Sequence, residues 1–355
     1  MEDLFNLQGN NRFFASDNAA PVHPEVMSAL SMANRGHAMA YGGDAMTEAA
    51  GEMFGKLFGR PAHTFFAFNG TGANILALYP LVEAFGAVIC PCDAHINTDE
   101  TGAFERVVGA KLQTVPTPDG KLTSEMILSQ LDGRGSMHHP QPQVVSIAQV
   151  TETGLVYTPG EIRAIADCCH ENGLTLHMDG ARVAQAAAAL GVSIAAITSQ
   201  AGVDTLSFGG TKNGLMFGEA VISFIEPPAR ALPYMRKQIT QLASKMRYIA
   251  AQYIAYLTDE LYMRNARAAN AMAKLLAEGL QALPGVEFTH PVQANIIFAK
   301  IAPELRESML KRAFFHVFDE RNGLCRIVTS FDTTREDVDG LIAAARGDDR
   351  KESDS

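Results

Sequence analysis

The sequence predicts an α/β protein with a large domain built on a mostly parallel sheet and a smaller α+β domain after it. Short apolar segments alternate with longer amphipathic stretches over the first two thirds of the chain. These segments are continuously apolar, which is typical of strands in a largely parallel sheet that is covered on both faces. After about residue 235 the pattern changes to a long helical region followed by isolated strand-like segments.

The predicted elements follow this pattern in order. The large domain is expected to hold seven strands, at 64–68, 87–90, 112–115, 144–148, 174–178, 205–208 and 220–224. Helical patterns at 160–172 and 194–201 lie between them, and a long helical region runs to about residue 282. The rest holds strand candidates at 286–288, 296–299 and 326–329 and a final helix at 335–346. We place the seam within 225–250, from Pro227-Pro228 onward, and divide the chain into residues 1–245 and 246–355.

Composition excludes several classes of protein. The 355 residues are 47% hydrophobic and 19% charged, as in an ordinary globular protein. A net charge of −10 without a Lys/Arg cluster argues against nucleic acid and anionic membrane surfaces as partners. No apolar run approaches the roughly 20 residues that span a bilayer, and no secretory signal pattern is visible.

Cysteine and metal-ligand spacing point to a cytoplasmic protein without a metal site. The five cysteines are odd in number and none has CxxC spacing, so we expect reduced, buried thiols. They are Cys90, Cys92, Cys168, Cys169 and Cys325. No cluster of metal-ligand residues is present.

The first candidate site residue is Lys212, in the segment SFGGTKNG at residues 207–214. Its glycines let the backbone approach a bulky ligand closely. A lysine on such a turn can be desolvated, which lowers its pKa and frees the amine to form a Schiff base. Taken alone, the segment fits a solvated lysine on an ordinary turn at least as well.

The second candidate is the segment HMDGAR at residues 177–182, which ends a predicted strand. An acidic residue at the carboxyl end of a parallel strand points into the crevice where α/β proteins bind ligands. Asp179 can pair there with a protonated pyridine nitrogen, and Arg182 can donate to a phenolic ring oxygen. The alternative is that Asp179 caps the next helix and Arg182 lies on the surface.

A glycine-rich segment, NGTGAN at residues 69–74, separates a predicted strand from a predicted helix. Glycine-rich backbone and a hydroxyl group at a helix N-terminus form an anion site, which suits a cofactor phosphate. A dinucleotide-binding loop would need a third glycine near Leu76, and a Walker A loop would need Gly-Lys-Ser/Thr. Neither is present.

His95 follows the predicted strand 87–90. A histidine at this point can stack on a planar ring and can move protons near neutral pH. A lone histidine is more often structural, but its place one strand after the anion loop makes it a site candidate.

Together these motifs resemble the low-specificity threonine aldolases of the β-eliminating lyase group. Asp179 followed by a lysine 33 residues later is also the layout of pyridoxal 5′-phosphate enzymes with the aminotransferase-like fold, fold type I. The resemblance covers nearly the whole chain. It rests on Ser16-Asp17-Asn18, Tyr41-Gly42-Gly43-Asp44, Gly70-Thr71-Gly72, His95, Asp179-Gly180-Ala181-Arg182, Lys212, Met246-Arg247 and Arg326-Ile327-Val328-Thr329.

The resemblance implies a role for each matching residue. Pyridoxal 5′-phosphate is expected to form a Schiff base with Lys212, to lie under His95 and to pair its ring nitrogen with Asp179. Its phosphate would be held by Gly70, Thr71 and Gly72, and Arg182 would lie beside its ring oxygen.

Substrate and partner roles are implied in the same way. Ser16 and Arg326 are expected to grip the substrate carboxylate, for which a planar guanidinium is well shaped. Tyr41 and Arg247 are expected to enter the site from the neighbouring subunit of a homodimer or homotetramer.

The implied reaction is the retro-aldol cleavage of an L-β-hydroxy-α-amino acid to glycine and an aldehyde. His95, directly or through water, is the first candidate for the base, and Glu152 is the second. Another lyase or an aminotransferase with the same cofactor would use the same lysine and aspartate. A non-catalytic α/β binding protein is the more remote alternative.

Three positions depart from the family pattern. Thr211 replaces a serine, residues 149–154 (QVTETG) contain no histidine, and Ser330 stands where a histidine is usual. These features resemble the phenylserine-aldolase branch. We therefore expect substrates with bulky β-substituents to be accepted at least as well as threonine, with Phe331 as a candidate apolar wall.

Overall fold

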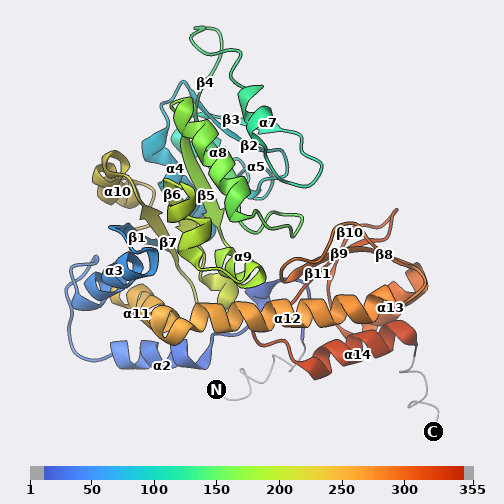
Figure 1. Cartoon of the computed structure of the whole chain (residues 1–355). Helices are drawn as coiled ribbons and strands as arrows, with labels where there is room; N and C mark the ends of the chain where they lie inside the picture. The colour runs from blue at the N-terminus through green and yellow to red at the C-terminus, as the bar shows by residue number, and fades with distance from the viewer. Residues whose placement is uncertain (1–11, 348–355) are drawn as a thin grey trace.

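A seven-stranded sheet forms the centre of the larger part of the molecule (Figure 1). The structure is a computed structural model that describes residues 12–347. The strand order is β1-β7-β6-β5-β4-β2-β3, and only β7 runs against the other strands. The strands are β1 (His63–Ala67), β2 (Gly86–Pro91), β3 (Lys111–Val115), β4 (Gln141–Ala148), β5 (Thr175–Gly180), β6 (Thr205–Phe208) and β7 (Glu219–Ser223). All seven predicted strands are present, and the prediction of a mostly parallel sheet is confirmed.

Helices pack on both faces of this sheet, because alternate side chains of a strand point to opposite faces. In β7, Ala220 and Ile222 belong to the largest hydrophobic cluster, whereas Val221 belongs to another cluster on the opposite face. The helices of this part are α2 (Pro24–Ala33), α3 (Ala45–Phe58), α4 (Gly70–Leu78), α5 (His95–Thr98), α6 (Ala103–Val108), α7 (Ser124–Leu128), α8 (Pro159–Glu171), α9 (Val183–Leu190), α10 (Glu226–Gln238) and α11 (Arg247–Leu257).

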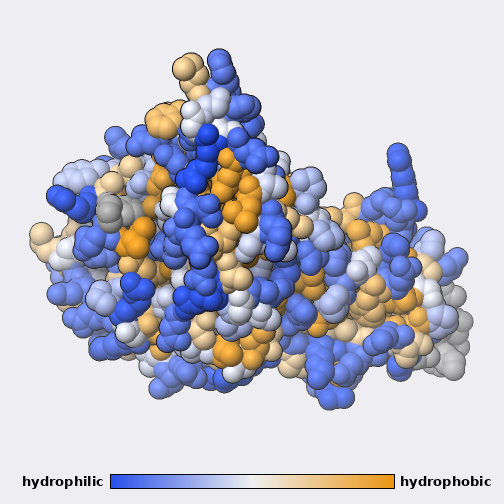
Figure 2. All heavy atoms as spheres, turned by 45° about the horizontal axis from the view of Figure 1, so that its top comes forward, coloured by the Kyte–Doolittle hydropathy of each residue, from blue (hydrophilic) through white to orange (hydrophobic). Residues whose placement is uncertain are grey.

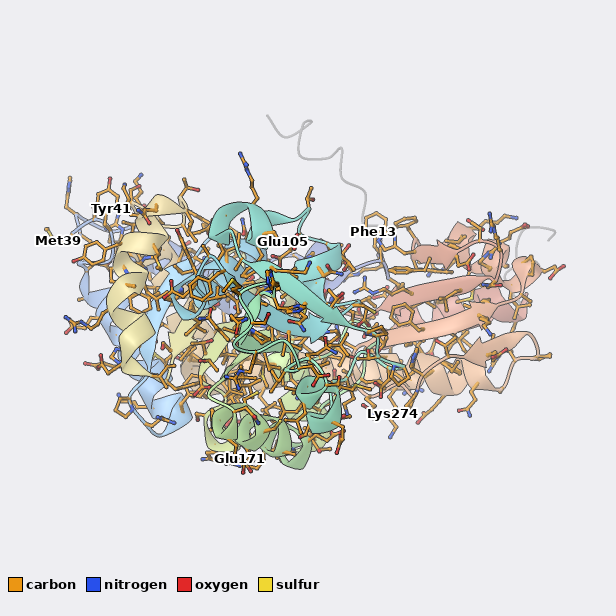
Figure 3. The ribbon with its side chains drawn as sticks, turned by 90° about the horizontal axis from the view of Figure 1, so that it is seen from above. Phe13, Met39, Tyr41, Glu105, Glu171 and Lys274 are labelled. Atoms are coloured by element: carbon orange, nitrogen blue, oxygen red, sulfur yellow. The ribbon has the colours of Figure 1, made fainter. Side chains whose placement is uncertain are left out.

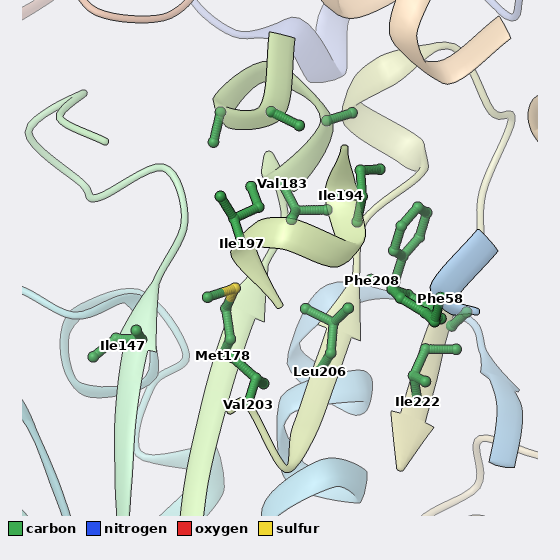
Figure 4. Close-up of a cluster of buried hydrophobic side chains, with 14 of the residues drawn as sticks. Phe58, Ile147, Met178, Val183, Ile194, Ile197, Val203, Leu206, Phe208 and Ile222 are labelled. Carbon is green, nitrogen blue, oxygen red and sulfur yellow. The ribbon is translucent and has the colours of Figure 1, made fainter. Parts of the chain in front are cut away.

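Figure 4 shows part of the largest cluster, where the sheet meets α9 and the turn after it. Met178 and Leu206 lie beneath Val183, Ile194 and Ile197. The segment expected to be one helix at 194–201 is instead two short 3₁₀ turns, Ile194–Ile197 and Ser199–Ala201. The residue between them, Thr198, has φ −134° and ψ −101°, which interrupts a continuous helix.

The long helical region expected up to residue 282 consists of separate helices. After α10 the backbone leaves the helix, with Thr240 at φ 63°, and α11 follows. Asp259 and Glu260 also have positive φ, which separates α11 from α12 (Leu261–Gln281). Pro227-Pro228, where the predicted seam begins, lies in the first turn of α10, where a missing N–H is tolerated.

A second sheet, with strand order β10-β11-β9-β8, forms the smaller lobe and is wholly antiparallel. Its strands are β8 (Val286–Phe288), β9 (Ile296–Ile301), β10 (His316–Asp319) and β11 (Leu324–Val328), and its further helices are α13 (Pro303–Arg312) and α14 (Arg335–Arg346). β10 was not predicted. The N-terminal segment joins this lobe, because Phe14 N donates to Phe314 O and Phe14 O accepts from Val328 N.

The long helix α12 runs from the larger part into the smaller lobe (Figure 1). Ala266, near its start, packs in the largest cluster, whereas Ala273 packs in the cluster of the smaller lobe. Tyr253 of α11 also packs in the largest cluster. The division between residues 245 and 246 stays a prediction, and side-chain packing alone would place a boundary inside α12. Figure 2 shows the larger body and the smaller lobe joined by a narrower waist.

Two further expectations bear on the surface. Within residues 12–347, no single helix is both long and apolar enough to cross a membrane. α9 and the turns at Ile194–Ala201 meet such a criterion only as a pair, and they are bent by 105° relative to each other. All five cysteines are free, but the expectation that all are buried is wrong for Cys92, which is exposed.

Candidate active site

The predicted motifs converge at one edge of the large sheet. β1, β2, β4, β5 and β6 run in the same direction, so their carboxyl ends meet there. A cavity of about 690 Å³ opens at this edge, between the sheet and the smaller lobe. Five predicted site residues line it: Ser16, His95, Arg182, Lys212 and Arg326. Segments that are far apart in the sequence therefore form one site.

Lys212 lies in the 3₁₀ turn Thr211–Asn213 directly after β6. The glycines before it serve packing: a Cβ on Gly209 would lie 2.4 Å from Ala181 O, and one on Gly210 would lie 2.3 Å from Leu215 Cδ1. The positive charge of Arg182, followed by burial, lowers the pKa of Lys212. The lysine is therefore poised to be an uncharged amine more often than a solvated lysine is, which favours nucleophilic chemistry.

Asp179 is the next-to-last residue of β5. Its Oδ2 accepts from Asn74 Nδ2 at 2.8 Å, and its Oδ1 accepts from Ala181 N at 3.0 Å. Burial alone would raise the pKa of Asp179, but Lys212 and the hydrogen bond from Asn74 lower it below the ordinary value. The carboxylate is therefore kept ionised, as pairing with a protonated ring nitrogen requires.

Arg182 does not lie on the surface, so the alternative raised from the sequence is wrong. It is buried and makes a two-point ion pair with Asp17, with Nε–Oδ2 and Nη2–Oδ1 distances of 2.7 and 2.9 Å. Asn295 Nδ2 also donates to Asp17 Oδ2, at 3.0 Å. Asp17 thus joins the N-terminal segment, the large sheet and the smaller lobe beside the cavity.

His95 is the first residue of α5 and is partly exposed to the cavity. Its Nδ1 lies 2.8 Å from Oε1 of Glu100, whose side chain is fully buried. The hydrogen bond to Glu100 raises the pKa of His95 in spite of partial burial.

The glycine-rich segment begins α4, as predicted, and Gly70 is the first residue of that helix. Asn69 caps the helix by accepting from Gly72 N at 2.8 Å. A Cβ on Gly72 would lie 2.3 Å from Gln241 Cδ, so the backbone is tightly approached at this point. Thr71 lies within this capping turn but is not among the residues that line the cavity. Thr211 Oγ1 is buried and has no hydrogen-bond partner within residues 12–347.

Tyr41 and Arg247 do not line the cavity of their own chain. Tyr41 N donates to Ser244 O at 2.9 Å, and Arg247 Nη1 donates to Gly36 O at 3.1 Å. Tyr41 is 52% exposed, and Figure 3 shows it with Met39 at the end of the molecule that is remote from the smaller lobe.

Sequence reasoning missed several residues that line the cavity. Asp93, Thr98 and Asp99 lie in the same stretch as His95 and were not singled out, and Asn18 and Thr153 also belong to quoted motifs. Phe298, His316 and Phe318 enter from β9 and β10 of the smaller lobe. The alternation in HVFD, which places His316 and Phe318 on one face of β10, is the signal that could have found them.

The expected contribution of Ser330 and Phe331 to the aldehyde pocket is not found. Ser330 Oγ donates to Asp332 Oδ1 at 2.6 Å, and the ring of Phe331 packs against His23 with centroids 5.3 Å apart. Neither residue lines the cavity. Glu152, from the loop without histidine, does line it. Within the described part of the chain, no group of three or more His, Cys, Asp or Glu residues is arranged to hold a metal ion.

Comparison with known proteins agrees with this geometry. Residues 14–302 match the beta-eliminating lyase family. The chain is 45% identical to the low specificity L-threonine aldolase of Pseudomonas aeruginosa, over 94% of this chain and 96% of that protein. It matches the structure of a threonine aldolase from Leishmania major with a TM-score of 0.90 and 30% identity, over 95% and 99% of the two chains.

The fold extends to more distant enzymes. The aspartate aminotransferase of Thermus thermophilus matches with a TM-score of 0.67 over 94% of this chain and 90% of that chain, although only 17% of the residues are identical. The predicted fold type I is therefore confirmed. From the family match and the similarity over nearly its whole length, this chain belongs to the beta-eliminating lyase family and groups within it with the low-specificity L-threonine aldolases.

Proposed function

We propose that this protein cleaves L-β-hydroxy-α-amino acids of the threonine type to glycine and an aldehyde, with pyridoxal 5′-phosphate bound at Lys212. The observation that carries the proposal is that Lys212 and Arg326 line one cavity at the strand ends, beside the ionised Asp179. The close relatives named threonine aldolases support the same reaction.

The residues present fit this cofactor. Lys212 makes no hydrogen bond or ion pair within residues 12–347, and its amine is available for covalent attachment of the cofactor aldehyde. Asp179 would pair with the ring nitrogen, and His95 would lie against the ring. The start of α4, with Gly70, Thr71 and Gly72, would hold the phosphate, and the buried Oγ1 of Thr211 would be a further donor beside Lys212. When bound, the cofactor supplies an electron sink for carbon–carbon bond cleavage.

Ser16 and Arg326 bind the substrate carboxylate. Arg326 lines the cavity and makes no ion pair with any residue that the structure describes. Burial and the neighbouring Arg182 lower the pKa of Arg326, which disfavours the free cation and therefore favours an anionic ligand. Arg182 donates to Asp17 from Nε and Nη2, and it would lie beside the ring oxygen of the cofactor.

His95 removes the proton of the substrate β-hydroxyl group, directly or through water, and Glu152 is the second candidate for this role. Both line the cavity. An imidazole is suited to such a transfer because it can both accept and release a proton, and the hydrogen bond to Glu100 raises the pKa of His95, which makes it a stronger base.

The β-substituent of the substrate faces an aromatic wall of Phe298 and Phe318, whose ring centroids lie 5.6 Å apart at 82°. This wall takes over the role first expected of Phe331. Because aromatic surfaces gain from contact with further apolar surface, the wall favours large β-substituents such as the phenyl group of phenylserine.

Two copies of the chain complete each site, as a homodimer or a pair of dimers. Tyr41 and Arg247 do not line the cavity of their own chain, and they lie next to an apolar groove that includes Phe68, Phe217 and Tyr248. The exposed side chains of Met39 and Tyr41 continue this surface. The cytoplasm is the proposed compartment, consistent with five free cysteines.

The reaction is tested by product analysis. Purified enzyme is incubated with L-threonine, L-allo-threonine and L-threo-phenylserine, and glycine and the aldehyde are quantified together. Equal amounts of both products are expected, and Lys212→Ala is expected to form neither. A keto acid with ammonia would instead indicate β-elimination, and a keto acid with amination of the cofactor would indicate transamination. A purified protein without bound cofactor absorbance and without product would favour a binding protein.

A further inference from the structure

A chain of four side chains runs beneath the cavity from His95 to Asp179. His95 Nδ1 lies 2.8 Å from Glu100 Oε1, and Asn74 Nδ2 donates to the same oxygen at 2.9 Å. The same Asn74 nitrogen donates to Asp179 Oδ2 at 2.8 Å. The two hydrogens of the Asn74 amide are thus donated to two carboxylates from different segments. Glu100 lies between α5 and α6, and Asp179 lies in β5.

From this arrangement we infer that Glu100 is a positioning residue for the cleavage reaction: it fixes the tautomer and orientation of His95, and Asn74 locks this pair to Asp179. A carboxylate only accepts hydrogen bonds, so Nδ1 of a neutral His95 carries the hydrogen. The lone pair is then on Nε2, the ring nitrogen left for the cavity. The inference rests on the proposed function, because it gives the proposed base its proton-accepting atom.

The burial of Glu100 distinguishes this arrangement from a surface ion pair. Its side chain is fully buried, whereas that of His95 is 30% exposed. Oε2 of Glu100 and Oδ1 of Asn74 are also buried and have no partner within residues 12–347. Burying a polar atom without a hydrogen-bond partner costs free energy. A residue that served packing alone would therefore be apolar at the position of Glu100.

Several charged groups besides Glu100 influence the protonation of His95. Glu100 from the segment after α5, Asp179 from β5 and Glu152 from the loop after β4 favour the protonated ring. The cavity is also lined by the carboxylates of Asp93 and Asp99, by the imidazole of His316 and by three opposing cations, Lys212, Arg182 and Arg326. Glu100 is the one in hydrogen-bond contact with the ring, and its bond is the largest cause of the raised pKa of His95.

The first experiment measures the tautomer of His95 in the wild-type chain, and a variant serves only to assign the signals. The cofactor-free enzyme, labelled with ¹⁵N-histidine, is titrated by NMR, and the His95 signals are assigned by their loss in His95→Asn. The expected result is the Nδ1–H tautomer at high pH. Finding the Nε2–H tautomer would overturn the inference, whatever the activity of the enzyme.

The second experiment uses Glu100→Gln in the holoenzyme. Removing the carboxylate lowers the pKa of His95, so the acidic limb of the kcat/KM profile moves to lower pH, by about 1 pH unit for loss of an adjacent opposite charge. The plateau falls by about 10² or more, because the amide can donate to Nδ1 and impose the wrong tautomer. The matched control is Glu105→Gln, whose side chain accepts from Leu112 N and does not touch His95.

The outcomes separate the two proposals. If wild-type enzyme releases no aldehyde, the proposed function fails, while the tautomer measurement still decides the role of Glu100. If wild-type enzyme cleaves and Glu100→Gln keeps an unchanged acidic limb and His95 titration, Glu100 is a structural residue and the inference is wrong.

Discussion

Lys212 and Asp179 influence each other's ionisation in the same buried region. The cation of Arg182 and burial lower the pKa of Lys212, while Lys212 and Asn74 offset the effect of burial on Asp179. Asp17 in turn neutralises Arg182 through two short hydrogen bonds. The region therefore holds an amine inclined to lose its proton next to a carboxylate inclined to stay ionised, which is the pair that the proposed cofactor requires.

We expect Asp179→Asn to keep bound cofactor but to lose most activity. A neutral amide does not hold the ring nitrogen protonated, and lost electrostatic stabilisation of this kind costs about 3–4 kcal/mol, or about 10²–10³ in rate. Visible absorbance of the bound cofactor and kcat are measured on the same preparation. The matched control is Asp204→Asn. Asp204 pairs with His170 and lies directly before β6, at the other edge of the sheet. Near-wild-type turnover of Asp179→Asn would refute the role.

At the scale of elements, the large sheet was predictable because its strands are buried on both faces and read as apolar runs. β10 was not, because HVFD alternates between exposed and half-buried positions and carries a histidine and an aspartate. The residues of the candidate site were predictable to the same extent as the elements that carry them. Residues at the ends of the buried strands could be found from the sequence, whereas Phe298, His316 and Phe318 depend on how the smaller lobe folds over the sheet.

Long-range pairing set a second limit on prediction. Asp17 and Arg182 are 165 residues apart, and no periodicity or spacing connects them. The Ser16-Asp17-Asn18 motif named the right segment, but the ion pair that buries Arg182 appears only in the fold. The same holds for Asn74, whose contacts with Glu100 and Asp179 come from α4 packing beside β5.

β10 also carries a prediction about substrate choice. Phe318 is 60% exposed and stands edge-to-face with Phe298 at the cavity. We expect wild-type enzyme to use L-threo-phenylserine at least as well as L-threonine. Phe318→Ala should lower kcat/KM for phenylserine about 10-fold relative to threonine, because an aromatic contact of about 1–1.5 kcal/mol is lost.

The comparison needs a control outside the cavity, and Phe331→Leu provides it, since Phe331 packs on His23. That variant should leave the ratio of the two kcat/KM values unchanged. An equal loss for both substrates in Phe318→Ala would mean that the wall does not contact the β-substituent, and a clear preference of wild-type enzyme for threonine would contradict the wall altogether.

At the scale of the whole molecule, the cavity lies where three parts of the chain meet. The N-terminal segment brings Ser16 and Asp17, the large sheet brings Lys212, and the smaller lobe brings Arg326. Asp17 pairs with Arg182 of the larger part and accepts from Asn295 Nδ2 of the smaller lobe, so the side chain of Asp17 ties all three parts together. Any rotation of the smaller lobe would therefore move Arg326 relative to Lys212.

The absence of Tyr41 and Arg247 from the lining of their own cavity leads to a prediction about assembly. If each site takes Lys212 from one subunit and Arg247 from the other, then Lys212→Ala and Arg247→Ala are each inactive, but a mixed dimer holds one intact site. With equal amounts and random pairing, half of the dimers are mixed and one of their two sites works, so about a quarter of wild-type activity should return.

The control mixture is Lys212→Ala with Arg326→Ala. Lys212 and Arg326 line the same cavity of one chain, so this mixture leaves no intact site in any pairing. Subunit exchange is verified with differently tagged chains. Equal recovery in both mixtures, or none in the first once exchange is shown, would place Arg247 outside a shared site.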